Sequence, residues 1–340
     1  MTVVFVIAIF LILIFPHEVG HFLMAKLSGM RVEKFSLGFG PRIWGIKRKE
    51  TEYVISLFPI GGYVKIAGMG PGEENVKEGF YSKPLSKKLA VILSGSLMNF
   101  LVSIILFSLI FIIGFQTLDL ESPLVGGVIK NSPAEKAGIQ PGDRIISING
   151  HKIDRWQQIA SFVQGEEEKE LKILILREKT NLVFKVKPEY YPEYKRRLIG
   201  ISPSTRFIHY DPLTSIGLGV QRVAFLIGLI FRYLGNMIEG KVPAQFAGPL
   251  GIVEYVGEAS KLGIVPFLSL AAVLGVNLGL FNLFPIPALD GGRLLFLLIE
   301  VVRKKPLGIE FQEFVHYIGF LILIILMFLV TYQDILRLLG

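Results

Sequence analysis

Four segments of this chain are long and apolar enough to cross a lipid bilayer, and they restrict its fold more than any other feature. They cover about residues 3–26, 89–115, 264–284 and 314–333. Backbone polar groups inside hydrocarbon must bond within the protein, so such segments fold as helices. A mean hydropathy of +0.55 over 340 residues indicates that the membrane part dominates. We therefore expect a polytopic α-helical membrane protein with about four transmembrane helices.

The first apolar segment contains three ionisable side chains, in the sequence His17-Glu18-Val19-Gly20-His21. Positions i and i+4 of a helix share one face, so both imidazoles can bind one ion while Glu18 lies beside it. In this H-E-x-x-H pattern the histidines bind Zn²⁺ and the glutamate accepts a proton from water. An interfacial helix end with two surface histidines is the alternative. About 12 to 15 preceding residues place the motif roughly 20 Å along the helix, inside the bilayer, where ionisable groups usually mark a function.

A third metal ligand is expected where the third apolar segment ends, in the sequence NLFPIPALDGGR of residues 282–293. Two prolines break the helix before Asp290 and two glycines follow it, so its carboxylate lies on non-helical backbone near the cytoplasmic face. The chain has no cysteine, so zinc must be held by histidine and carboxylate. Two histidines and one carboxylate, with water in the fourth position, form a catalytic zinc site. Alternatively, Asp290 caps a helix that starts at Leu294.

Basic residues flank the apolar segments and indicate the topology. The loop after the first segment and the link after the third are expected to be cytoplasmic, with the N-terminus and residues 116–263 outside. These flanks account for the net charge of +8, so no nucleic-acid partner is expected. No basic region precedes the first apolar run, which argues against a cleavable signal peptide. The basic residues concerned are Lys26, Arg31, Lys34, Lys83, Lys87, Lys88, Arg293, Arg303, Lys304 and Lys305.

The cytoplasmic loop of residues 31–69 is rich in β-branched and aromatic residues, interrupted by Gly-Phe-Gly-Pro and Ile-Gly-Gly-Tyr. This pattern predicts a hairpin or small sheet, with residues 47–50 as its turn. The loop is apolar enough to dip into the membrane, which non-helical backbone tolerates only beside protein or a watery cavity. We therefore expect a membrane-associated β-hairpin region against the active site. An ordinary surface sheet is the alternative.

The one soluble domain covers about residues 120–190. Its sequence Ser-Pro-Ala-Glu-Lys-Ala-Gly (132–138), followed by Pro-Gly-Asp (141–143), resembles the bacterial type of PDZ domain. In that run, proline starts a short helix, glycine ends it, and Gly-Asp makes a turn. PDZ domains bind peptide ends as an added strand. Residues 198–201 form either its carboxylate-binding loop, in a permuted arrangement, or a plain closing strand.

Residues 213–238 are also long enough to span, but they contain Gln221, Arg222 and Arg232. We favour a helix lying on the outer membrane surface, because a fifth span would invert the last two segments. The expected organisation has four parts. Residues 1–115 hold the first two membrane helices and the β-rich loop, 116–205 the extracytoplasmic PDZ domain, 206–263 a membrane-surface helical region, and 264–340 the last two membrane helices.

Three motifs in this order, HEVGH, GSLMN (95–99) and NLFPIPALDGG, resemble the site-2 protease family. With one PDZ domain between the second and third spans, the chain is most similar to the regulator of sigma-E protease group. Some members carry two PDZ domains, so gating by a tandem pair is not expected here. The resemblance implies an intramembrane zinc endopeptidase that cuts transmembrane segments already trimmed by another protease. The implied roles are His17, His21 and Asp290 as zinc ligands, Glu18 as general base, and Asn99, Asn282, Phe39 and Gly40 in substrate binding.

A helical substrate hides its carbonyl groups in its own hydrogen bonds, so it must unwind before it is cut. An edge strand, expected within Phe35–Ile46, could stabilise the extended form. The expected partners are transmembrane protein substrates, the lipid bilayer and a peptide in the PDZ groove. The expected location is the bacterial cytoplasmic membrane, with the active site toward the cytoplasm.

Two other functions are compatible with parts of the pattern. A catalytically silent PDZ scaffold would keep the soluble domain but would not need Glu18. A metal transporter would need ionisable residues in several spans with paths to both faces. His151, His209 and His316 are isolated in sequence and are interpreted as surface or interfacial residues, not ligands.

Overall fold

The computed structural model describes residues 2–70, 76–165, 170–243, 247–305 and 307–339. It divides into two compact units, which are described separately. The helical unit comprises Met1–Ile113 and Tyr210–Gly340, and the β-rich unit comprises Gly114–His209. The β-rich unit contains the whole of the predicted PDZ domain, residues 116–205.

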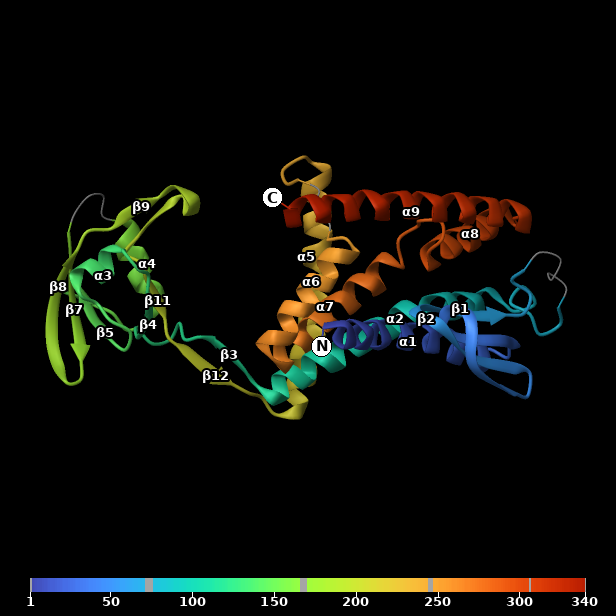
Figure 1. Cartoon of the computed structure of the whole chain (residues 1–340), viewed down its shortest axis with the longest axis horizontal. Coiled ribbons are helices and arrows are strands. Elements are labelled where there is room, and N and C mark those ends of the chain that lie inside the picture. The colour runs from blue at the N-terminus through green and yellow to red at the C-terminus, as the bar shows by residue number, and fades with distance from the viewer. Residues whose placement is uncertain (1, 71–75, 166–169, 244–246, 306, 340) are drawn as a thin grey trace. The chain divides into compact units, whose positions relative to one another are not determined.

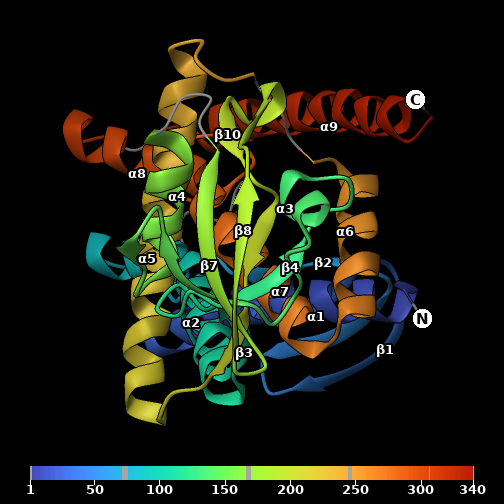
Figure 2. The same ribbon diagram turned by 90° about the vertical axis from the view of Figure 1, so that its left-hand side faces the viewer.

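The helical unit contains long helices where the sequence predicts membrane spans (Figure 1). Within the described part of the chain, five helices are long and apolar enough to cross a membrane. Four of them correspond to the predicted spans, and the additional one is α5. Figures 1 and 2 both show α5 running across the direction of α9. The number of spans therefore depends on how α5 lies in the membrane. The helices are α1 (Thr2–Leu27), α2 (Leu85–Ile113), α5 (Pro212–Ile238), α6 (Pro249–Leu262), α7 (Ile264–Phe281), α8 (Asp290–Arg303) and α9 (Ile309–Leu339).

Small and polar residues form the contacts between the spanning helices. Gly20 of α1 lies against α2, where an added Cβ would come within 2.4 Å of the Ser94 carbonyl oxygen. Gly275 of α7 lies equally close to Ser103 of α2, with 2.4 Å from an added Cβ to Oγ. Lipid tails are as apolar as leucine, so membrane helices gain little by burying leucine and associate through such close contacts.

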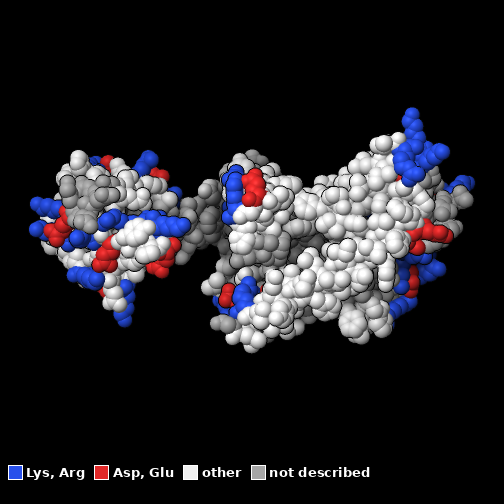
Figure 3. Space-filling view, turned by 90° about the horizontal axis from the view of Figure 1, so that it is seen from above, with Lys and Arg blue, Asp and Glu red and all other residues white. Residues whose placement is uncertain are grey.

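Many large apolar side chains of the helical unit are exposed, although others, such as Phe107 and Phe267, are buried. Leu97, Leu101, Leu321 and Phe328 are among the exposed ones. In the face that Figure 3 shows, the charged side chains of this unit gather at its ends and leave an uncharged band between them. A band of this kind matches the hydrocarbon layer of a bilayer.

The loop after α1 forms two long antiparallel strands, β1 (Val32–Arg48) and β2 (Thr51–Ile66), which confirms the predicted hairpin and its turn. Each strand is bent, so the hairpin folds over into four short segments. Residues 34–37 pair on one side with 52–55 and on the other with 62–65, and residues 42–48 pair with 51–56. Gly38, Gly40 and Gly61 adopt positive φ at the bends, which other residues rarely do.

This arrangement corrects the position of the expected edge strand. Phe35 and Leu37 have strand partners on both sides and lie in the interior of the folded hairpin. Among the described residues, the outer segments are 42–48 and 62–66. The Phe35–Ile46 interval therefore contains one edge, at its C-terminal end, and misses the other.

In its described residues, 114–165 and 170–209, the β-rich unit has a four-stranded antiparallel sheet in the order β6-β5-β7-β8, with two helices and three two-stranded pairs, β3–β12, β4–β11 and β9–β10. Its core consists of large aliphatic residues, including Ile145, Ile148 and Ile173, none of which is exposed. The elements are β3 (Phe115–Leu118), β4 (Val125–Val128), α3 (Pro133–Ala137), β5 (Arg144–Ile148), β6 (His151–Lys152), α4 (Trp156–Gly165), β7 (Leu171–Arg177), β8 (Thr180–Val186), β9 (Glu189–Tyr191), the 3₁₀ turn Pro192–Tyr194, β10 (Arg196–Leu198), β11 (Ile201–Pro203) and β12 (Thr205–Ile208).

The motif that resembles a PDZ domain has its predicted conformation. The Ser132 side chain caps α3 by accepting from the Glu135 N–H, and Gly138 ends the helix with a φ of 94°. Asp143 is 1% exposed and is bound by the guanidinium of Arg177, with 2.7 Å between Nε and Oδ1. The aspartate of the Pro-Gly-Asp turn therefore pairs with β7 and holds the turn onto the sheet.

Candidate metal centre

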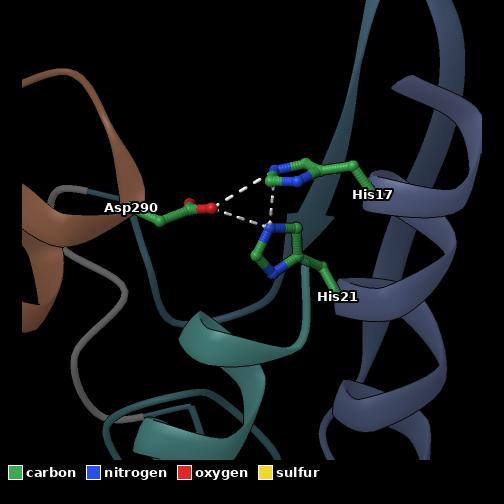
Figure 4. A group of neighbouring side chains, drawn as sticks. All are labelled: His17, His21 and Asp290. Carbon is green, nitrogen blue, oxygen red and sulfur yellow. Dashed lines mark hydrogen bonds and ion pairs between the residues drawn. The ribbon is translucent and has the colours of Figure 1, made fainter. Parts of the chain in front are cut away.

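His17 and His21 lie one turn apart on α1 and point toward Asp290, the first residue of α8 (Figure 4). Asp290 Oδ2 is 3.2 Å from His17 Nε2 and 3.1 Å from His21 Nε2. The two Nε2 atoms are 3.2 Å apart. Two side chains four positions apart on α1 and a third, 269 positions after His21, thus form a nearly equilateral triangle of ligand atoms.

The break after α7 brings Asp290 to this point. The chain turns between Phe281 and Asp290, and the N–H of Gly291 donates to the carbonyl of Asn282 at 2.7 Å. A Cβ on Gly291 would lie 2.0 Å from the Phe284 carbonyl oxygen, so only glycine fits there. The expectation that Asp290 lies on non-helical backbone is wrong, because α8 already begins at Asp290. For the same reason the carboxylate is not the cap of a helix starting at Leu294.

The triangle matches the donor set and the size of a zinc site. Ligand atoms about 2.0–2.1 Å from a tetrahedral zinc ion lie roughly 3.3 Å from one another. The observed separations of 3.1–3.2 Å are close to that value. Two imidazoles and one carboxylate also form the usual protein part of a catalytic site, which keeps a further position for water.

The second span leaves room for the two rings and orients one of them. Gly95 of α2 faces the site, and an added Cβ would lie 2.2 Å from His21 Nε2. The His21 ring donates from Nδ1 to the carbonyl of Val91 at 2.8 Å, which leaves Nε2 free to bind a metal. The first residue of the GSLMN motif, Gly95, therefore allows α2 to lie close to the two histidine rings.

Glu18 lies beside the ligands in a cavity of about 340 Å³. The outer segment of β2 forms another wall of this cavity, and a Cβ on Gly62 would come within 2.8 Å of Glu18 Cγ. The cavity thus combines a metal-binding triangle, a carboxylate and a strand edge. A polypeptide in extended form could meet all three there. The cavity is lined by His17, Glu18, His21, Phe39, Gly62, Tyr63, Val64, Ile66, Met69, Phe80, Val91, Ile92, Ala288, Leu289, Asp290, Arg293, His316 and Phe320.

A model of peptidase family M50 matches residues 5–326 of this chain. The chain belongs to peptidase family M50.

Relatives match over nearly their whole length. Zinc metalloprotease RasP of Bacillus licheniformis is 33% identical and regulator of sigma-W protease RasP of Bacillus subtilis is 31% identical, each over 99% of both chains. Zinc metalloprotease RasP of Geobacillus kaustophilus is 29% identical over 98% of this chain and 97% of its own length. The predicted family and class, a site-2 type zinc metalloprotease, are confirmed.

Solved PDZ domains are similar to part of the chain. The PDZ domain of an SdrC-like protein of Listeria monocytogenes is 19% identical, covers 26% of this chain and 92% of its own length, and has a TM-score of 0.23.

The four residues expected to bind substrate lie in different places. Phe39 lines the cavity and stacks on Tyr63, with 6.1 Å between ring centroids. Gly40 lies next in β1, beside the Phe58 ring. Asn282 ends α7 and holds the Asp290 turn through its carbonyl. Asn99 is 1% exposed and its amide Nδ2 lies 3.3 Å from His17 Nδ1. Substrate binding by all four stays a prediction.

The sequence interpretation missed His316. It was expected to be a surface or interfacial residue with no part in the site, but it is half-buried, lines the cavity and accepts a hydrogen bond at Nδ1 from the Ala288 N–H at 3.1 Å. Ala288 has a φ of 81°, so His316 supports an unusual backbone conformation two residues before Asp290. An ionisable residue in the last apolar segment was the available signal.

Proposed function

We propose that this chain is an intramembrane zinc endopeptidase that cleaves transmembrane segments of membrane proteins. One observation carries the proposal: Glu18 lies beside the His17–His21–Asp290 triangle. Both histidines and Glu18 belong to α1, a helix that is itself apolar enough to span the membrane. Family M50 membership and relatives named zinc metalloproteases support the chemistry.

His17, His21 and Asp290 would hold the zinc ion. A zinc ion held by them would supply Lewis-acid chemistry, which polarises a carbonyl group and acidifies water near neutral pH. Glu18 accepts the proton of the attacking water and can return it to the leaving amine. Arg293 adds a positive charge to the same cavity wall.

The outer segment Gly62–Ile66 is the edge that we propose for binding an unwound substrate. Exposing one helical turn in an apolar medium costs several kcal/mol for each unsatisfied backbone group. A strand edge can offer backbone donors and acceptors in register. Among the described residues, this segment has a strand partner on one side only, and four of its five residues line the cavity of Glu18.

We propose four spans, with α5 on the outer surface of the bacterial cytoplasmic membrane. Its direction across α9 and its residues Gln221, Arg222 and Arg232 support this orientation. The active site then opens toward the cytoplasm and the β-rich unit lies outside. Because the chain has no cysteine, single cysteines can test this. Cysteines replacing Arg48 and Lys304 should react only from the cytoplasm and one replacing Lys152 only from outside; labelling of 48 and 152 from one side would contradict it.

The PDZ-like unit has a candidate peptide groove. A cavity of about 370 Å³ lies between α4 and residues 194–203, and it includes the predicted carboxylate loop, residues 198–201. Gly200 in this loop has a φ of 85°. We propose that the groove receives a peptide end, which suits a protease acting after a first cut elsewhere. A pre-trimmed anti-sigma factor and signal-peptide remnants are both compatible substrate classes.

The test uses the purified full chain and a model transmembrane substrate. Wild type should cut inside the apolar segment, with the site mapped by mass spectrometry. Glu18→Gln should keep its zinc and lose turnover, because an amide cannot accept the proton. Full activity of Glu18→Gln would remove Glu18 as the base. If zinc-loaded wild type did not cleave the substrate, a scaffold function would be favoured. If the protein moved zinc across the membrane of lipid vesicles, a transporter function would be favoured.

A further inference from the structure

Asn99 occupies an unusual position beside the metal centre. It is 1% exposed, and its Nδ2 lies 3.3 Å from His17 Nδ1. Its Oδ1 is buried without a hydrogen-bond partner among the described residues, and so is Oγ of Ser96, one turn earlier on α2. Leaving such groups unpaired costs about 1–3 kcal/mol each, so buried polar groups in native proteins are nearly always paired.

A metal-binding His17 changes what Asn99 must do. Nε2 of His17 faces Asp290 and His21, so that nitrogen offers its lone pair to a metal. The neutral ring then carries its proton on Nδ1, which needs an acceptor. His21 meets the same requirement with the Val91 carbonyl. At His17, a donor such as an amide NH₂ would face another N–H.

We propose that Asn99 orients His17 for zinc by accepting the Nδ1–H of the ring through Oδ1. The two ends of an amide have nearly the same shape, so a 180° turn of the side chain brings Oδ1 to His17 without moving other atoms. The NH₂ group of Asn99 then takes the former position of Oδ1. Oγ of Ser96, which lies on the same helix face and is also buried, can accept a hydrogen bond from it. Asn99 is a positioning residue, and the inference rests on the proposed zinc chemistry.

The alternative for Asn99 is the predicted direct contact with substrate. The two roles differ in what they require of the side chain. Orientation of His17 requires an acceptor and affects the zinc affinity with no substrate present. Substrate binding affects the KM and leaves the zinc affinity unchanged.

The test measures the zinc dissociation constant of the purified full-length chain by competition with a chromogenic chelator. Loss of a residue that orients a ligand typically weakens metal binding about 10–100-fold, and we expect this for Asn99→Ala and for Asn99→Leu, which keeps the branched arrangement of heavy atoms. Asn99→Asp keeps an acceptor and should stay within a few-fold of wild type. Ser108→Ala, another buried polar change on α2, is the matched control and should leave the affinity unchanged.

A Co²⁺-substituted protein gives a second readout that folding alone would not change. The visible absorption of Co²⁺ should shift in Asn99→Leu and keep its wild-type form in Asn99→Asp. Wild-type zinc affinity in Asn99→Ala, or equal losses in Asn99→Asp and Asn99→Leu, would overturn the proposal. Normal zinc binding with a raised KM in Asn99→Ala would overturn it as well, and would show that Asn99 contacts the substrate instead. The Glu18→Gln experiment is independent of all these results.

Discussion

Most of the buried polar side chains among the described residues lie in the helical unit, and few lie in the β-rich unit. In the β-rich unit, most of the fully buried residues described are aliphatic, such as Ile145, Ile148 and Ile173. In the helical unit, Ser96 and Ser103 are equally buried, while Leu101 is 49% exposed. Water drives the first arrangement through the hydrophobic effect, and lipid removes that driving force from the second. The helical unit can therefore use its interior for polar chemistry, which a water-soluble core of this size could not hold as easily.

The largest expected effect concerns a glycine that makes the polar interior possible. Gly95→Ala would put a Cβ 2.2 Å from His21 Nε2, and neither backbone nor ligand can move without disturbing the triangle. We expect loss of most bound zinc and of more than about 100-fold in cleavage rate. Zinc analysis and a cleavage assay measure both. Gly217→Ala, on open helix surface, is the control; equal effects of the two changes would contradict the close fit.

The second prediction compares the same type of truncation in the two units. Ile173→Ala should destabilise the β-rich unit by about 2–5 kcal/mol, because it leaves a cavity in an aliphatic core. Leu101→Ala, on an outward face in lipid, should cost less than about 1 kcal/mol. Hydrogen exchange of the full chain in lipid reports both: β5, β7 and β8 should lose protection in the first variant only. A comparable loss in α2 for Leu101→Ala would mean that this face is covered by protein.

The smallest effect is expected at the strand edge. Gly62→Ala places a Cβ 2.8 Å from Glu18 Cγ and 2.9 Å from the Ser36 carbonyl oxygen. Displacement of the general base should reduce the cleavage rate by about tenfold, while the zinc content stays normal. Gly235→Ala, with open space around it, is the control. A loss of zinc together with activity would mean that this edge supports the ligands rather than Glu18.

Local patterns in the sequence predict much of this architecture. Residues i and i+4 lie on the same face of an α-helix, so the pairing of His17 and His21 can be predicted from their spacing. The prolines and glycines of residues 285–292 predict the break after the third apolar segment and the position of Asp290 near it. The same holds for the capped helix of the PDZ-like unit, since each residue acts within one turn.

Long-range packing is what the sequence does not reveal. The hairpin was predicted, but its fold into four segments depends on which strand halves meet, so Gly62–Ile66 was not recognised as the edge beside Glu18. His316 and Asn99 acquire their partners from segments far away in the chain. Neither contact leaves a periodic signal.

The central claim is that the polar interior of the helical unit exists to hold a catalytic metal, and the zinc content of Asp290→Ala tests it most directly. Purified wild type and Glu18→Gln should each contain about one zinc ion per chain, because their three ligands are intact. Asp290→Ala should contain almost none, with unchanged hydrogen exchange in the β-rich unit as evidence that it is folded. Full zinc content in Asp290→Ala would contradict the account, since the metal would then be held by a different set of residues.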